Sequence, residues 1–240
     1  MKLIIAGATG LLGNELVRQS LQIREINQVV ALAHQPVQLD ESIDLSKLKS
    51  IIIRDYGEYP DDVKAEFTGA DACIWTVPIT ALRTSKVELK RLCQDCTKLG
   101  FEAMYEAAPA RPFRFMYLSA EGITRDPTKK PVIMPDYNIM RCNTELIVLK
   151  FPTEKEGVEV CIARPGVIAN SSTWSRALVA NLFHIVNFFG RPLPTIQRSE
   201  LVAAVLNQVM DGFDKETLLN ADLVRLGRRE LKFRSMPQTL

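Results

Sequence analysis

The chain has 240 residues, of which 47% are hydrophobic and 24% charged, as in soluble globular proteins that bury a core. Its 30 basic and 28 acidic side chains leave a net charge of +2, and the basic runs 129–130 and 225–229 are short, so nucleic acid is not an expected partner. The apolar stretch 178–189 is too short and too polar to span a bilayer, so no membrane partner is expected either.

The first apolar run, residues 3–6, follows Met1 and Lys2 directly and ends in a glycine-rich turn. We therefore expect no signal peptide and a cytoplasmic protein. The five cysteines, an odd number, favour reduced thiols. Cys93 and Cys96 form a C-x-x-C, but inside a helical pattern and without a second pair or a histidine cluster. Ordinary helix residues are favoured there over a metal or redox site, and no metal is expected.

Short β-rich runs alternate with longer helical segments over the first two thirds of the chain. Strands are predicted at residues 3–6, 28–33, 50–54, 71–77, 113–119 and 158–163. Helices are predicted at residues 12–20, 61–67, 86–108 and 137–150. This alternation predicts an α/β fold with a doubly wound parallel sheet covered by helices on both faces.

The last third of the chain follows this alternation less clearly. Helices are predicted at residues 174–188, 199–212 and 220–227, the last with Asn220 as its N-cap. Because this part is too short for a core of its own, we expect one domain, 1–240, in which residues 167–240 form a small helical substrate-side lobe.

Two segments are candidates for lining a substrate pocket. Helix 174–188 carries aromatic and polar side chains at near-helical spacing, which suits a pocket wall but suits a core helix with a polar stripe better. The proline-containing connection between residues 119 and 137 has the length of a lid or binding loop.

A glycine-rich turn follows the first predicted strand and opens the first predicted helix. Its glycines permit a tight turn, close approach of a diphosphate and close packing of the helix on the strand. The helix N-terminus adds free N–H groups and a partial positive charge. The turn therefore predicts a dinucleotide site that includes Gly7, Thr9, Gly10, Leu11, Leu12 and Gly13.

This G-x-x-G-x-x-G spacing, with Thr9 before the second glycine, resembles the extended and atypical short-chain dehydrogenase/reductases, which have the Rossmann fold and bind NAD(P). They include NmrA-like and Tat-interacting-protein-like branches and oxidoreductases of fungal polyketide pathways. The resemblance extends through Tyr137 to Pro165 and Gly166, which it implies lie at the cofactor site. It also implies secondary metabolism, a homodimer and a small, hydrophobic or aromatic, polyketide-like carbonyl or alcohol substrate.

The end of the second predicted strand bears on the choice of cofactor. NAD-selective sites usually carry Asp or Glu there, whereas this chain has His34 and Gln35, which can donate hydrogen bonds to a 2′-phosphate. NADP(H) is therefore favoured over NAD(H). Asp55 matches the position where relatives hold the adenine amino group, and a solvated loop aspartate is the alternative. Thr76 and Val77 end the fourth predicted strand, where the cofactor ribose would pass.

The same resemblance implies a catalytic serine at the end of the fifth strand and a Tyr-x-x-x-Lys on the next helix. Ser119 and Tyr137 match, and Tyr137 would exchange a proton with the substrate oxygen. Arg141 replaces the lysine. Its permanent charge can still stabilise a tyrosinate and it falls at the cofactor ribose, but its planar head cannot copy an ammonium group.

Three functions remain open on this pattern. Arg141 either serves in a working NAD(P)(H)-dependent oxidoreductase, or Tyr137 acts as acid or base in a dehydration, isomerisation or ring opening. The third possibility is an inactive, cofactor-sensing regulator like the NmrA branch. The oxidoreductase is the favoured prediction.

Overall fold

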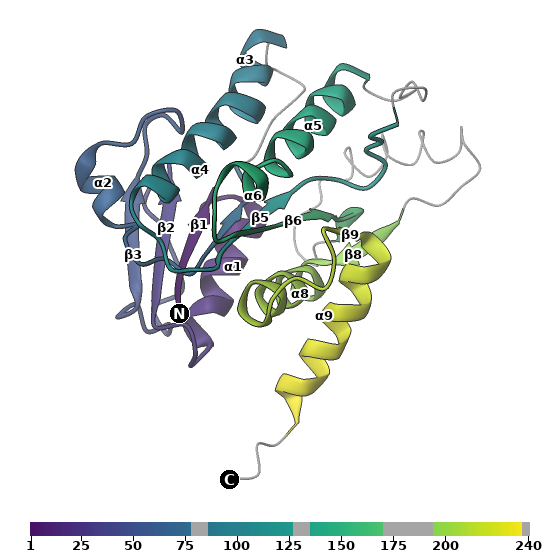
Figure 1. Cartoon of the computed structure of the whole chain (residues 1–240). Coiled ribbons are helices and arrows are strands. Elements are labelled where there is room, and N and C mark those ends of the chain that lie inside the picture. The colour runs from purple at the N-terminus through teal and green to yellow at the C-terminus, as the bar shows by residue number, and fades with distance from the viewer. Residues whose placement is uncertain (78–85, 127–134, 170–193, 237–240) are drawn as a thin grey trace.

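The computed structural model describes residues 1–77, 86–126, 135–169 and 194–236. Its centre is a seven-stranded, wholly parallel sheet with strand order β3-β2-β1-β4-β5-β6-β9 (Figure 1). The strands are β1 (Lys2–Ala6), β2 (Gln28–Ala33), β3 (Leu48–Ile52), β4 (Ala72–Trp75), β5 (Phe113–Leu118), β6 (Val158–Arg164) and β9 (Thr217–Leu219). This confirms the predicted doubly wound α/β sheet of the Rossmann type.

Helices cover both faces of the sheet, so its central strands are buried on both sides. Along β1, Leu3 and Ile5 belong to one apolar core and Ile4 to the other, and all three are fully buried. Parallel strands buried in this way read as continuous apolar runs rather than as alternating patterns, which is why the short runs were recognisable in the sequence.

Each face has its own set of helices. One face packs against α1 (Leu11–Gln22), α8 (Arg198–Asp211) and α9 (Asn220–Ser235). The other packs against α2 (Asp61–Ala65), α4 (Cys96–Glu106), α5 (Pro135–Val148) and α6 (Phe151–Glu154). In Figure 1 the first set lies below the sheet and the second above it.

The predicted helix 86–108 is continuous but not uniformly α-helical. It comprises α3 (Lys86–Lys90), a π-helical turn η1 (Arg91–Asp95) and α4. The extra residue in a π turn shifts the helix register, and such turns are frequent at functional sites. Cys93 and Cys96 are fully buried here, and burial raises the pKa of both thiols to about 11.

Three short strands were not predicted. These are β9 and the pair β7 (Val167–Ala169) and β8 (Thr195–Gln197), which form a separate two-stranded parallel sheet. The predicted N-cap of the last helix is wrong: α9 begins at Asn220 itself and runs to Ser235. The Asn220 side chain instead accepts the Gly166 N–H (2.8 Å) and donates to the Thr195 carbonyl (3.1 Å), so it joins α9 to the small sheet.

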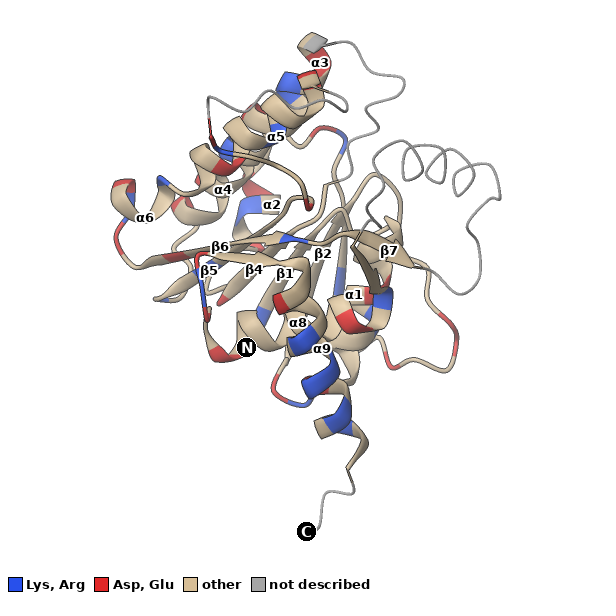
Figure 2. Ribbon diagram, turned by 90° about the vertical axis from the view of Figure 1, so that its right-hand side faces the viewer, with Lys and Arg blue, Asp and Glu red and all other residues tan. Residues whose placement is uncertain are grey.

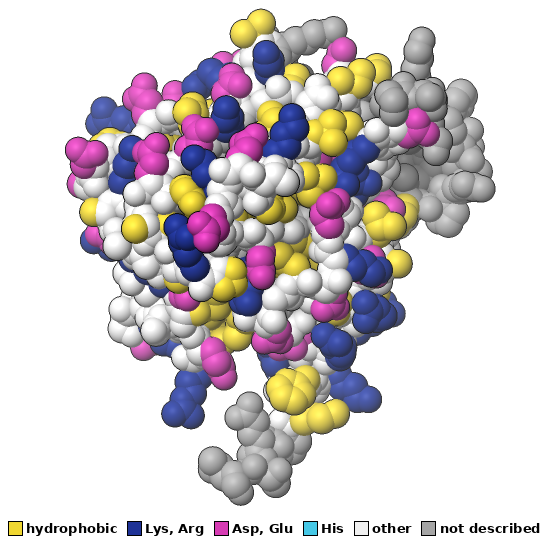
Figure 3. All heavy atoms as spheres, in the orientation of Figure 1, with side chains coloured by type: hydrophobic (Ala, Val, Ile, Leu, Met, Phe, Trp, Pro, Cys, Tyr) yellow, Lys and Arg dark blue, Asp and Glu magenta, His cyan; other side chains and the backbone are white. Residues whose placement is uncertain are grey.

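The predicted helix 174–188 and most of the proline-containing loop lie outside the described residues. No helix within the described ranges has both the length and the apolar character that a membrane crossing requires. The basic side chains along α9 (Figure 2) are largely paired: Arg228 with Glu200 (2.8 Å) and Arg234 with Glu230 (2.9 Å). On the face shown in Figure 3, basic and acidic side chains are interspersed over most of the surface.

Candidate functional site

The sheet has its topological switch point beside β1, because β2 pairs on one side of β1 and β4 on the other. The connections from β1 and β4 therefore leave in opposite directions and open a crevice at the carboxyl ends of these strands. Open α/β sheets bind their ligands in this crevice. The glycine turn occupies it, since Ala6 ends β1 and Leu11 begins α1.

Two of the three glycines are required by the backbone. Gly7 has a φ of +83°, which side-chain-bearing residues rarely adopt, and a Cβ there would lie 2.7 Å from the Thr76 carbonyl oxygen. A Cβ on Gly13 would lie 2.1 Å from the Gly7 carbonyl oxygen. A Cβ on Gly10 would have one near neighbour, the Gly7 carbonyl oxygen at 3.2 Å. The side of Gly10 that faces away from this oxygen is therefore open.

The amino end of α1 offers unpaired donors at this open side. The first backbone bond of the helix runs from the Asn14 N–H to the Gly10 carbonyl (2.9 Å). The amides of Leu11, Leu12 and Gly13 precede that bond and have no carbonyl partner inside the helix. The first turn carries no acidic side chain to compete for them, and Thr9 beside it is exposed. This open, donor-lined turn fits a dinucleotide diphosphate.

Tyr56, which sequence reasoning missed, fastens the glycine turn to the neighbouring strand. Its hydroxyl accepts the Gly7 N–H (3.0 Å) and donates to the Leu32 carbonyl at the end of β2 (2.8 Å). The side chain is buried, and burial raises the pKa of its phenol to about 12. No local pattern marks this residue, because its partners lie 49 and 24 positions away.

His34 and Gln35 directly follow β2, as predicted, and both side chains are exposed. His34 Nδ1 lies 2.7 Å from the Ile53 carbonyl oxygen, and its ring meets the Tyr56 ring edge-on, with centroids 5.2 Å apart. The imidazole is thus held at the end of β2, next to the residue that holds the glycine turn.

Asp55 lies beside this group and is already engaged. It accepts the Gly57 N–H (2.8 Å) and forms an ion pair with Arg91 of η1 (2.9 Å). The Gly57 amide, together with Arg91, lowers the pKa of this carboxyl. Arg91 was not predicted as a site residue, since the chain position of a π turn has no sequence signature.

Thr76 and Val77 follow β4 at the crevice. The Thr76 hydroxyl donates to the Ala6 carbonyl (2.7 Å), so it links the ends of β4 and β1, and Val77 is buried. Pro165 and Gly166 follow β6. A Cβ on Gly166 would lie 2.1 Å from the carbonyl oxygen of Pro194, which directly precedes β8. This close packing is enough to require a glycine at position 166.

Ser119 directly follows β5 and is buried, and its hydroxyl is engaged with α5. It donates to the Glu145 carboxylate at 2.5 Å. Glu145 is fully buried and accepts further bonds from Arg125 Nε (2.8 Å) and Arg164 Nε (2.9 Å). Two arginines and one serine therefore converge on one carboxylate, which fixes α5 against the carboxyl ends of β5 and β6.

Arg141 is also held by the sheet. Its guanidinium donates to the Tyr117 hydroxyl (2.7 Å) and the Leu118 carbonyl (2.6 Å), and it is almost completely buried. Its Nε has no hydrogen-bond partner among the residues that the structure describes. The half-buried Tyr137 lies one turn earlier on α5, with the Arg141 guanidinium 5.8 Å from its ring centroid. The Tyr137–Arg141 pair thus lies together on α5, beside the strand that Ser119 follows.

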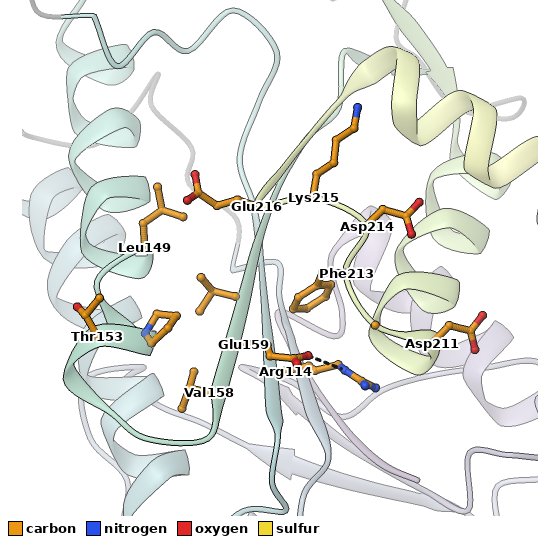
Figure 4. A pocket seen from close by; sticks show the side chains of 13 residues that line it. Arg114, Leu149, Thr153, Val158, Glu159, Asp211, Phe213, Asp214, Lys215 and Glu216 are labelled. Atoms are coloured by element: carbon orange, nitrogen blue, oxygen red, sulfur yellow. Dashed lines mark hydrogen bonds and ion pairs between the residues drawn. The ribbon is translucent and has the colours of Figure 1, made fainter.

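A hollow lies at the opposite end of the sheet, at the amino ends of its strands (Figure 4). It has a volume of about 890 Å³ and is lined from the amino ends of β5 and β6, from α6 and from the α8–β9 connection. Arg114 of β5 and Glu159 of β6, neighbours on adjacent strands in its lining, form an ion pair (3.1 Å). None of the predicted site residues lines this groove. Within the described ranges, no group of three or more His, Cys, Asp or Glu side chains is placed to hold a metal ion.

No family model matches the chain. A curated relative from Purpureocillium lilacinum, described as leucinostatins biosynthesis cluster protein T, is 32% identical over 124 residues. That match covers 51% of this chain and 44% of the relative, so it spans less than half of that protein.

Solved structures are similar at the level of the fold. MoeE5, determined in complex with UDP-glucuronic acid and NAD, has a TM-score of 0.67 at 17% identity, covering 91% of this chain and 75% of that one. The oxidoreductase ylbE from Lactococcus lactis has a TM-score of 0.59 at 18% identity, covering 96% and 98%. The chain therefore shares the Rossmann-type fold of these structures.

Proposed function

We propose that this protein is an NAD(P)(H)-dependent short-chain oxidoreductase. The observation that carries the proposal is the glycine turn, which presents the free amides of Leu11, Leu12 and Gly13 at the topological switch point. The similarity of the fold to MoeE5, whose structure contains NAD, supports it. The absence of a carboxylate after β2 favours NADP(H) over NAD(H).

The proposed substrate is a small, hydrophobic or aromatic, polyketide-like carbonyl compound or the matching alcohol. A bound nicotinamide supplies hydride transfer at this site. Tyr137 would give its phenolic proton to the carbonyl oxygen in reduction, or take the proton from the alcohol in oxidation. The Arg141 cation, 5.8 Å from the tyrosine ring, would stabilise the tyrosinate. Ser119 would position the reacting oxygen.

Two measurements test the proposal. Isothermal titration calorimetry with NADPH and NADH is expected to show binding, and NADPH consumption with a panel of aromatic ketones and quinones is expected to show turnover. Tyr137→Phe should abolish turnover and leave nucleotide affinity unchanged. Failure to bind either nucleotide, or full activity of Tyr137→Phe, would overturn the proposal.

A second candidate function is a cofactor-sensing regulator without turnover. It is favoured by the contacts of two presumed catalytic groups: the Ser119 hydroxyl donates to Glu145, and Arg141 donates to Tyr117 and Leu118. A regulator would bind NADPH and NADP⁺ with different affinities and turn over no substrate in the panel. Arg141→Lys separates the two, because a gain of reductase activity would indicate a site diverted from catalysis.

A further inference from the structure

The hydrogen bond of His34 fixes which ring nitrogen carries the proton. Nδ1 lies 2.7 Å from the Ile53 carbonyl oxygen, and a carbonyl oxygen can only accept, so Nδ1 is the donor. In a neutral imidazole the other nitrogen, Nε2, is then an acceptor. On protonation Nε2 becomes a donor while the Nδ1 bond is kept. Nε2 therefore accepts a hydrogen bond when the ring is neutral and donates one when the ring is protonated.

This free nitrogen belongs to a fixed, accessible ring. His34 is exposed, and Nε2 has no hydrogen-bond partner among the residues that the structure describes. The ring meets Tyr56 edge-on at 5.2 Å with an interplanar angle of 80°, and Tyr56 in turn binds the Gly7 N–H. The imidazole is thus connected through one side chain to the turn that would hold the diphosphate.

The charges facing the ring come from two other elements. Asp55, after β3, interacts electrostatically with His34, and Arg91 of η1 forms an ion pair with that aspartate. The other group packed on the ring is the Tyr56 phenol, which burial keeps protonated. The turn residues Gly7 to Gly13 carry no charge. Within the described part of the chain, the Ile53 carbonyl is the hydrogen-bond partner of the His34 ring and Asp55 is the charged group that interacts with it.

We propose that His34 selects between the two nicotinamide dinucleotides through its protonation state. The neutral ring accepts a hydrogen bond from the ribose 2′-hydroxyl of NAD(H), and the imidazolium donates to, and pairs with, the 2′-phosphate of NADP(H). This inference rests on the proposed function and assigns its cofactor specificity to one residue at the end of β2, where Rossmann proteins contact the 2′ position. The preference for NADP(H) then grows as the pH falls through the range in which histidine titrates.

The test measures binding rather than activity. Calorimetric Kd values for NADP⁺ and NAD⁺ are determined at constant ionic strength between about pH 5.5 and 8.5, since salt screens a phosphate contact. In the wild type, the ratio of the NAD⁺ Kd to the NADP⁺ Kd should rise about tenfold from the alkaline to the acidic end, the scale of one charge-assisted hydrogen bond.

His34→Gln is the diagnostic variant, because glutamine can bond to either cofactor but does not titrate. The 2′-phosphate itself gains a proton near pH 6, which weakens NADP⁺ binding in acid, so this variant should show a flat or opposite trend. Gln35→Asn, a matched change at the neighbouring exposed position, should keep the wild-type trend.

The outcomes separate the two proposals. If both nucleotides bind and His34→Gln has the wild-type pH profile, the inference about His34 fails and the proposed function stands. If neither nucleotide binds the wild type, the proposed function fails and this inference with it. A second measurement uses only the wild type and so does not depend on the folding of a variant. The midpoint of the His34 titration, followed by NMR, should move to higher pH on adding NADP⁺ but not on adding NAD⁺. The same midpoint with both nucleotides would overturn the inference.

Discussion

The Tyr56 hydroxyl adds to the bonds that join the glycine turn to the sheet, since the Gly7 and Ala8 N–H groups also donate to the Leu32 carbonyl (3.0 Å each). Tyr56 accepts from Gly7 and donates to Leu32, so it closes the space between the first turn and the end of β2. Its ring also supports His34. One side chain therefore contacts both the glycine turn and the imidazole at the end of β2.

Tyr56→Phe is expected to keep the packing of the ring and to lose both hydrogen bonds. The Leu32 carbonyl keeps the Gly7 and Ala8 N–H donors, so the free energy of unfolding should fall by about 0.5–1.5 kcal/mol for each hydroxyl bond lost, and NADP⁺ binding should weaken because the turn is less well fixed. Urea denaturation and calorimetry measure the two effects. The control is Tyr105→Phe, whose hydroxyl donates to the Glu156 carbonyl at an exposed position (3.2 Å). Equal losses in the two variants would contradict the role given to Tyr56.

The Asp55 carboxylate gives the protein a predictable response to acid. The Gly57 amide and Arg91 lower its folded-state pKa below the ordinary value of 3.8. A carboxyl whose pKa is lowered by folding contributes stability above its unfolded pKa, and that contribution is lost as the pH falls through the folded one. The free energy of unfolding of the wild type should therefore fall more steeply between about pH 5 and 2 than that of Asp55→Asn.

Circular dichroism melts across this pH range provide the measurement. Asp62→Asn removes the same charge from an exposed position on α2 and serves as the control. An acid limb that is identical in the wild type and Asp55→Asn would show that the ion pair with Arg91 does not stabilise the fold.

At the scale of residues, the sequence predicted what depends on local spacing and missed what depends on the fold. Gly7, Gly10 and Gly13 were recognisable because three glycines at fixed offsets follow an apolar run. Tyr56 and Arg91 were not, because each meets its partners only after distant strands and helices pack together. The position of His34 directly after β2 was predicted, but the direction of its hydrogen bond depends on the place of Ile53 in the fold.

At the scale of elements, α5 depends on a single buried carboxylate. Glu145 accepts from Ser119 and Arg125, which lie in the segment after β5, and from Arg164, which ends β6. A carboxylate facing two cations compensates charges that would otherwise be costly at this depth. The helix that carries Tyr137 and Arg141 is thereby fixed to the carboxyl ends of the two strands.

Glu145→Gln should destabilise the protein strongly, by about 3–5 kcal/mol, because two partly buried arginines lose their shared counter-charge. Ser119→Ala removes only one hydrogen bond from the same carboxylate and should cost about 0.5–1.5 kcal/mol. Chemical denaturation of the two variants compares these losses directly. If the glutamine variant is no less stable than the alanine variant, the carboxylate does not hold α5 in place.

The elements that the sequence failed to predict are short or irregular. Strands β7, β8 and β9 have three residues each, too few for a periodic pattern, and they form only where a neighbouring strand offers its edge. The π turn η1 interrupts a helix whose apolar residues still follow a helical period, so it was absorbed into one long helix. The end of α9 was placed too early because its last turns are polar and exposed.

At the scale of the whole molecule, the two helical layers are coupled through the strands they share. Each central strand sends alternate side chains into opposite cores, so neither layer can pack without the sheet. The sequence predicted this arrangement because continuous apolar runs alternate with amphipathic segments. It did not predict which helices share a face, since that depends on the order of the strands rather than on any segment alone.

This coupling predicts cooperative unfolding. Phe101 of α4 stacks on Phe151 in one core, with ring centroids 3.7 Å apart, whereas Leu201 of α8 is fully buried in the other. Phe101→Ala should lower the free energy of unfolding by about 3–5 kcal/mol and Leu201→Ala by about 2–5 kcal/mol. Because the two residues belong to different cores, the losses should add within about 0.5 kcal/mol in the double variant.

Far-UV and near-UV circular dichroism should report the same urea midpoint for each variant, because both layers lose their support together when the shared strands separate. Two separate midpoints, with the helices of one layer melting before the other, would show that the layers fold independently on the common sheet.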